Sequence, residues 1–215
     1  MIPALPIRIY PTRIACFALC SLTVLLAACE STPEKMPVDD PQRSWAEHQE
    51  RLAATDQWVA VGKLGIQSAE DSWTAGLNWR QDVGDYTIRL SGPLGQGLME
   101  LRGTAEAVEL RTSDDDIFRA PTAEELMQTH AGWQVPLSGL RHWILGLPDP
   151  QARIVDLQLD DYGRLAELRQ LGWHIRYERY AEFDGLALPT KLILENSRLR
   201  AKLAVRRWRT GPDST

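Results

Sequence analysis

Histidines and clustered acids are the side chains of this sequence that could carry catalysis or hold a metal ion. The four histidines, His48, His130, His142 and His174, lie far apart, and none belongs to an HExxH zinc motif. The sequence also lacks a G-x-S-x-G nucleophile motif and a glycine-rich lysine loop. We therefore predict no catalytic residue, no metal site and no cofactor. A pair of carboxylates that meet only in the fold would escape this search.

The densest acidic run is Asp114-Asp115-Asp116, which could in principle supply calcium ligands. It lacks the later glycine and glutamate of a calcium-binding loop. Acids between two strands usually form a solvated turn, and we assign this run, and Asp160-Asp161 with it, to turns.

Cys29 stands in a sequence context that indicates a covalent lipid. Arg8 and Arg13 precede an apolar run that ends in Leu-Ala-Ala-Cys at residues 26–29. Positive charge before a short apolar run is typical of a bacterial secretory signal, and the run falls short of the about 20 residues that a spanning helix needs. The four-residue ending resembles the cleavage site of a lipoprotein signal peptidase. We predict that residues 1–28 are removed as a signal peptide and that Cys29 is lipidated.

The mature chain would keep Cys29 as its only cysteine, because Cys16 and Cys20 leave with the signal. Neither a disulfide nor a cysteine metal site is then expected. Several acyl chains on Cys29 would hold the protein in a membrane essentially permanently. The next residue is Glu30, not the Asp that commonly retains lipoproteins in the inner membrane. We predict a protein anchored by lipid in the outer membrane and facing the periplasm.

The charge balance excludes nucleic acid as a partner. The chain has 24 basic and 29 acidic residues, a formal net charge of −5, and removal of the signal makes it more acidic. Binding to a phosphate backbone needs a basic face. The basic residues that do cluster could form a solvated strand face or a docking patch for a partner. They are Arg198, Arg200, Lys202, Arg206, Arg207 and Arg209.

The mature chain divides into a tether, one domain and a short tail. Residues 29–43 are proline-rich and charged, as in a flexible tether. Ser44 and Glu47 have the spacing of a capping box, which predicts a short helix ending near Asp56. A single domain should cover residues 44–210, followed by a tail of residues 211–215.

Beyond Gln57 the hydrophobic period changes to two, which predicts strands with one buried face. Short links that contain Gly or Asp join most of them as antiparallel neighbours. A sheet this large must curl, so we predict one mainly β domain built on an unclosed, curled antiparallel sheet. The expected strands cover residues 58–68, 72–80, 85–91, 98–103, 107–112, 115–120, 153–160, 164–170, 172–180, 188–195 and 199–208.

Two helices are expected between the sixth and seventh strands. Thr122 should cap the first, with Glu125 at the box position. The second should run from Ser138 to Leu145 and end at Gly146 and Pro148.

The turn SGPLGQG, residues 91–97, holds a leucine where polar residues are usual. Pro93 sets the turn and Gly95 permits a positive φ, so Leu94 could be held outward on a stiff loop. It either packs back onto the core or reaches an apolar surface outside the protein. The eight tryptophans leave a similar choice open, because a packed core and a cavity for an acyl chain use the same residue types.

Short sequence pieces occur along the chain in a fixed order: WAEH at 45–48, GKLGI at 62–66, LNW at 77–79, PLG at 93–95, LRHWILGLP at 140–148, Gly172-Trp173 with Tyr177, Leu188-Pro189 and Lys191-Leu192. In this order they resemble the LolB family of outer-membrane lipoprotein receptors. The resemblance covers about residues 44–208, and its most specific piece is WILGLP within residues 140–148. It implies an unclosed antiparallel β-barrel of about eleven strands, with inserted helices forming a lid over an apolar cavity. It also implies a monomer that takes acylated lipoproteins from the periplasmic carrier LolA and inserts them into outer-membrane lipid. A structural lipoprotein that scaffolds an envelope assembly without binding acyl chains is the alternative, and a periplasmic hydrolase is a further one.

Carried over by residue, the resemblance places the leucine that is essential for membrane insertion at Leu94, between Pro93 and Gly95. Trp79 and Trp143 also stand at positions typical of the family. Together with the strand pattern, this gives eight expected wall residues of the acyl cavity: Trp73, Leu77, Trp79, Ile88, Leu90, Trp143, Trp173 and Ile175.

Overall fold

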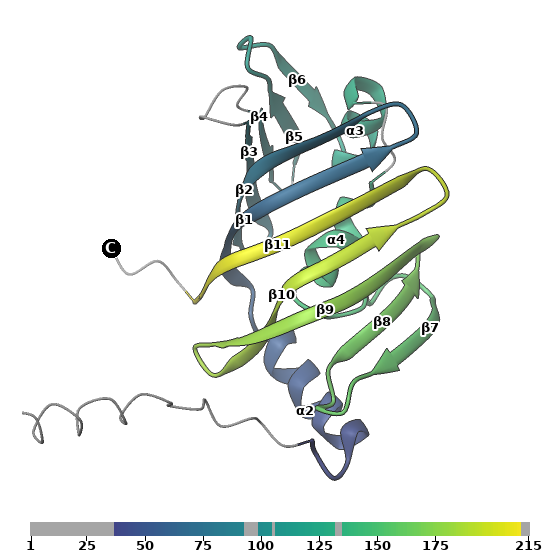
Figure 1. Cartoon of the computed structure of the whole chain (residues 1–215). Coiled ribbons are helices and arrows are strands. Elements are labelled where there is room, and N and C mark those ends of the chain that lie inside the picture. Colours follow the sequence, from purple (N-terminus) through teal and green to yellow (C-terminus); the bar gives the residue numbers. More distant parts are fainter. Residues whose placement is uncertain (1–36, 93–98, 105, 132–134, 212–215) are drawn as a thin grey trace, which may run out of the picture. The chain divides into compact units, whose positions relative to one another are not determined.

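Eleven antiparallel strands form one sheet in the computed structural model (Figure 1). The structure describes residues 37–92, 99–104, 106–131 and 135–211. Predictions for Cys29, Pro93, Leu94 and Gly95 therefore lie outside the described residues. The strands are β1 (Gln57–Ser68), β2 (Ser72–Asp82), β3 (Asp85–Ser91), β4 (Met99–Gly103), β5 (Val108–Arg111), β6 (Ile117–Ala120), β7 (Ile154–Leu159), β8 (Leu165–Gln170), β9 (Trp173–Phe183), β10 (Leu186–Glu195) and β11 (Leu199–Thr210).

The strand order explains why the sheet is not closed. It runs β6-β5-β4-β3-β2-β1-β11-β10-β9-β8-β7, so the last strand pairs with the first, and β6 and β7 form the two edges. The predicted unclosed antiparallel sheet of eleven strands is confirmed. The strands β1 and β11 approach closely at a bulge, where a Cβ atom on Gly62 would lie 2.1 Å from the carbonyl oxygen of Ala204. Only glycine fits there.

One face of the sheet is apolar along its whole width. In β2, Ala75, Leu77 and Trp79 are buried and alternate with more exposed residues, as a strand with one covered face requires. Leu90 of β3 and Trp173 of β9 line the same cavity. Four strands lie between them in the sheet order, a separation of about 24 Å in a flat sheet. The sheet must therefore curl around its apolar face.

Helices α3 (Ala123–Ala131) and α4 (Leu137–Trp143) lie together on one side of the sheet (Figure 1). The Thr122 hydroxyl accepts a hydrogen bond from the Glu125 N–H at 3.2 Å, which confirms the predicted cap. Helix α4 begins one residue earlier and ends two residues earlier than predicted. In the part of the chain that the structure describes, no helix is both long and apolar enough to cross a membrane.

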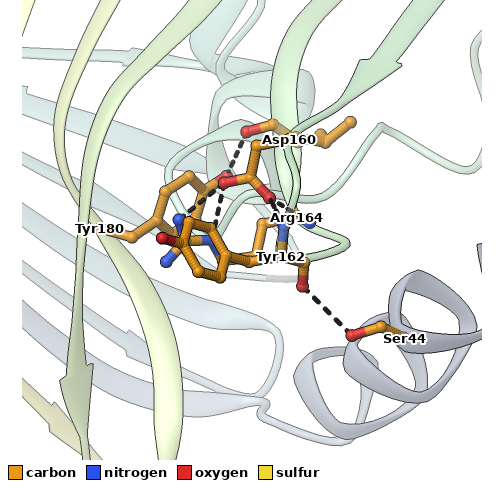
Figure 2. Close-up of polar contacts among 6 residues, drawn as sticks. Ser44, Asp160, Tyr162, Arg164 and Tyr180 are labelled. Carbon is orange, nitrogen blue, oxygen red and sulfur yellow. Dashed lines mark hydrogen bonds and ion pairs between the residues drawn. The ribbon is translucent and has the colours of Figure 1, made fainter. Parts of the chain in front are cut away.

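Helix α2 (Pro41–Ala53) begins four residues before the start that a Ser44 cap predicts. The Asp40 carboxylate accepts from the Arg43 N–H at 3.1 Å and so caps the helix, with Pro41 at the first helical position. The predicted Ser44 capping box is therefore wrong, and residues 41–43 are helical rather than part of a tether. The Ser44 hydroxyl instead donates to the carbonyl oxygen of Tyr162 at 3.1 Å (Figure 2).

Asp160 organises the turn that receives α2. Its carboxylate accepts from the backbone N–H groups of Tyr162 and Arg164 at 3.0 and 2.9 Å, and pairs with the Arg164 guanidinium at 2.6 Å. That guanidinium lies 4.7 Å from the ring centroid of Tyr162 and 4.4 Å from that of Tyr180 (Figure 2). Asp160 thus sits in a turn, as predicted, but it is an ion-paired structural residue rather than a solvated one.

Candidate functional site

An apolar cavity of about 110 Å³ lies against the inner face of the curled sheet. Its lining side chains are all Leu, Ile, Val, Met, Ala or Trp. Strands β1 to β4 and β9 to β11 form most of the wall, and α3 and α4 with the residues just before α4 complete it. The lining residues are Leu64, Ile66, Trp73, Leu77, Trp79, Ile88, Leu90, Met99, Leu101, Met127, Val135, Leu137, Leu140, Trp143, Trp173, Leu194, Leu199, Ala201 and Leu203.

The structure brings seven of the eight expected wall residues to this cavity: Trp73, Leu77, Trp79, Ile88, Leu90, Trp143 and Trp173. Ile175 is fully buried but is not part of the wall. It follows Trp173 on the same face of β9 and is paired with Leu168 and Leu194. It therefore belongs to the packed core beside the cavity.

Sequence reasoning missed the wall residues of β1 and β11, although their signal was present. Leu64 and Ile66 alternate with polar or glycine positions, and so do Leu199, Ala201 and Leu203. The wall residues in the helices had no comparable sequence pattern. Met127 and Leu140 stand in short helices, and the fold decides which side of each helix faces the cavity.

A carboxylate joins the two helices that cover the cavity. Glu124 of α3 accepts hydrogen bonds from both the backbone N–H and the hydroxyl of Ser138, each at 3.0 Å. Burial, with a contribution from the Glu124 charge, raises the pKa of the neighbouring Tyr86 to about 12. The contact is exposed to solvent, so it is a weak tie.

The other end of α4 is fixed much more firmly. Gln170 of β8 is 1% exposed, and its Oε1 accepts from the Trp143 indole N–H and the Asp149 backbone N–H, both at 2.9 Å. Its amide nitrogen donates to the carbonyl oxygens of Asp149 and Ala152, both at 2.8 Å. The Tyr177 hydroxyl donates to the Trp143 carbonyl at 2.9 Å, and burial raises its pKa well above the ordinary value.

An open polar groove of about 800 Å³ adjoins the cavity. Trp173 and Leu199 line both spaces, while Arg169, Arg198 and His174 line only the groove. The apolar space therefore borders a polar rim at the ends of β9 and β11.

The cavity offers apolar contact and little else. Among the residues that the structure describes, no titratable side chain lines it, and no three His, Cys, Asp or Glu residues are placed to hold a metal ion. An apolar cavity of about 150 Å³ binds a molecule as small as benzene. A space of about 110 Å³ is thus too small for a long hydrocarbon chain unless the wall moves.

Comparison with known proteins shows which family the chain belongs to. Residues 56–208 match the family model described as outer membrane lipoprotein LolB. The chain belongs to the LolB family. The match begins just before β1 and ends two residues before the end of β11, so it includes β1 to β10, most of β11, α3 and α4.

The LolB-family relatives are similar over most of their length. The outer-membrane lipoprotein LolB of Nitrosococcus oceani is 41% identical over 188 residues, which cover 87% of this chain and 94% of the relative. The LolB proteins of Cellvibrio japonicus and Pseudomonas aeruginosa are 40% and 37% identical, with coverage of at least 90% of each chain. A putative outer membrane lipoprotein-sorting protein domain from Vibrio parahaemolyticus shares the fold, with a TM-score of 0.51 at 10% identity over 81% of this chain and 96% of that domain.

Proposed function

We propose that this protein is a receptor, anchored in the outer membrane, that accepts acylated lipoproteins from the periplasmic carrier LolA and inserts them into the membrane. The observation that carries the proposal is the wholly apolar cavity between the curled sheet and α3 and α4. Membership of the LolB family supports it. The lipoprotein chain is cargo rather than substrate, and we propose no catalytic role.

The energetics favour such a cavity. One chain of about 16 carbons exposed to water costs on the order of 12 kcal/mol, at about 0.8 kcal/mol per methylene. A wall without polar anchors holds a chain by contact area alone, and it releases the chain wherever more apolar area is offered. Transfer can then run downhill from the carrier to this cavity and on to the bilayer.

Loading requires the cavity to open. Because Gln170 and Tyr177 hold the C-terminal end of α4 through buried hydrogen bonds, the movable part is α3 with the N-terminal end of α4. The exposed contact between Glu124 and Ser138 is the tie nearest to that region. Opening would separate α3 from the sheet while Trp143 stays in place.

The anchor and the insertion loop complete the proposal. A lipid on Cys29 would keep the domain within a short chain length of the acceptor bilayer and so raise its effective concentration. Leu94, held between Pro93 and Gly95, would enter the bilayer interface and open it locally for the cargo.

The direct test is transfer of an acylated lipoprotein from LolA to liposomes, with and without this protein. We expect transfer to need the protein, and equal transfer without it would contradict the proposal. The scaffold alternative predicts no binding of a fluorescent fatty-acyl probe, whereas the receptor should bind it. Turnover of a peptidoglycan or lipid substrate would instead indicate a hydrolase.

A further inference from the structure

Six of the 24 basic residues of this acidic protein lie close together in β11 and just before it. The chain has a formal net charge of −5, yet residues 198–209 contain six basic and no acidic side chains. Along β11, Leu199, Ala201 and Leu203 are buried, while Arg200 and Lys202 between them are exposed. The charges of Arg200 and Lys202 therefore lie on the outer face of the sheet, away from the cavity.

The register extends this outer face across neighbouring strands. Ala204 is paired with Lys63 of β1 on one side and with Lys191 of β10 on the other. Lys202 lies in the next row, opposite Ile193, which in turn is opposite Arg176 of β9. Adjacent strands are about 4.8 Å apart, so these side chains form one surface. We call it the cationic face, and it consists of Lys63, Arg176, Lys191, Arg200, Lys202 and Arg207.

Three carboxylates on or beside this face neutralise only part of its charge. Glu167 of β8 is opposite Arg176 and lies 2.8 Å from His174. Glu178 pairs with Lys191 at 2.6 Å, and this hydrogen bond lowers the pKa of Glu178 against a smaller opposing effect of burial. Glu195 lies 3.3 Å from Arg176 and 3.8 Å from Arg200. Within the described part of the chain, Lys63, Lys202 and Arg207 make no direct ion pair. The face thus keeps a positive excess.

The cationic face adjoins the strand end that leads into the predicted insertion loop. Lys63 is paired with Gly76 of β2, and Gly76 is paired with Ser91, the last residue of β3. Ser91 therefore lies two strands from Lys63 in the same row, about 10 Å away. The chain leaves the sheet at this level toward Pro93 and Leu94.

We infer that the cationic face docks on the headgroups of anionic phospholipids and orients the domain on the membrane. This inference rests on the proposed function, because it assumes the lipid anchor at Cys29. From Cys29 to Pro37 the chain spans eight residues and reaches at most about 28 Å, so a membrane surface is always the nearest large polyanion. The rest of this acidic molecule is repelled by such a surface, which leaves the cationic face as the favoured contact.

The test compares two triple variants of the mature chain carrying Cys29→Ser, which lacks only the lipid anchor. One variant carries Lys63→Gln, Lys202→Gln and Arg207→Gln. Its matched control carries Arg43→Gln, Arg111→Gln and Arg153→Gln, which remove the same charge from exposed positions off the cationic face. Binding to vesicles of phosphatidylcholine, with and without one-third phosphatidylglycerol, is measured by co-sedimentation in low salt.

We expect the parent chain to prefer vesicles that contain phosphatidylglycerol and to lose this preference as salt is added. Each basic residue near an anionic surface strengthens binding about fivefold, so the first variant should bind about 100-fold more weakly. The control should stay within a few-fold of the parent. Equal binding of all three chains, or no preference for phosphatidylglycerol, would overturn the inference.

Two further measurements distinguish docking on lipid from docking on a protein, and the docking surface from the receptor function. If the first variant binds vesicles normally but takes up no lipoprotein from the carrier, the cationic face docks a protein and the lipid assignment is wrong. Binding of the fatty-acyl probe should be the same in all three chains. If the parent chain binds no probe, but its vesicle binding still depends on the cationic face, the receptor function is refuted. The assignment of the docking surface would then still hold.

Discussion

Glu124 and Ser138 connect the two covering helices through a single carboxylate oxygen, which accepts from both the N–H and the hydroxyl of Ser138 at 3.0 Å. Ser138 is the second residue of α4, where a backbone N–H has no partner within its own helix. A side chain from α3 therefore completes the first turn of α4. The mobility of one helix is thereby coupled to that of the other.

Glu124→Ala should make the cavity easier to open. Loss of a capping carboxylate costs about 1 kcal/mol, so we expect uptake of a fluorescent fatty-acyl probe to be about fivefold faster in stopped-flow mixing. Glu125→Ala is the matched control, because Glu125 lies next in the same helix and only its backbone N–H bonds to Thr122. Unchanged uptake by Glu124→Ala would show that α3 does not limit opening.

Gln170→Leu should destabilise the domain strongly. The substitution leaves the Trp143 indole N–H, the Asp149 N–H and two carbonyl oxygens without their partner. Each buried polar group left unpaired costs about 1–3 kcal/mol, so the free energy of unfolding in urea should fall by about 4 kcal/mol or more. Gln158→Leu, at an exposed position of β7, should change it little. Similar values for the two variants would contradict the role of Gln170.

His142 should make the domain less stable in mild acid. Burial and the adjacent Arg141 lower the pKa of His142, and its Nε2 accepts from the Arg141 Nε–H at 3.2 Å, which requires a neutral ring. Below about pH 6.5 the unfolded chain binds a proton that the folded state resists, so stability falls as the pH falls. In the His142→Gln variant, the free energy of unfolding measured in urea should change little between pH 6.5 and pH 5. An equally steep fall in that variant would refute the assignment.

Ala201→Leu should block the cavity without affecting the outer face. Ala201 lines the cavity, and the added carbon atoms occupy space that an acyl chain would use. If contact with about two methylenes is lost, at about 0.8 kcal/mol each, affinity for the acyl probe falls about tenfold. Ala204→Leu makes the same change on the outer face of the same strand, between Lys63 and Lys191, and should leave probe binding unaltered. The prediction fails if the two variants bind alike.

Leu94→Glu should stop insertion while folding and acyl binding persist, because a charged side chain cannot enter the apolar interface. The measurement is transfer of a lipoprotein from the loaded protein to liposomes. Val83→Glu is the control, since Val83 is 60% exposed in the turn between β2 and β3. Insertion by the Leu94 variant at the normal rate would refute the role of Leu94.

The covering helices show where local sequence signals suffice. Thr122 caps α3 as its spacing to Glu125 predicts, because a cap involves only neighbouring residues. Ser44 and Glu47 have the same spacing, yet Asp40 caps α2 and Ser44 bonds to Tyr162, far away in the sequence. Asp40 and Ser44 could each cap the start of α2. The packing of α2 against the β7–β8 turn uses the Ser44 hydroxyl for the bond to Tyr162, so Asp40 is the cap.

The sequence by itself determined the strands, their antiparallel links and the apolar face, because alternation with period two depends only on the backbone. Trp73, Leu77 and Trp79 follow directly from that pattern. The tertiary structure alone decided that Ile175 packs in the core while Trp173 reaches the wall. It alone set the cavity at about 110 Å³ and brought Glu124 to Ser138. These depend on how far the sheet curls and where the helices settle on it, and both result from packing between residues distant in the sequence.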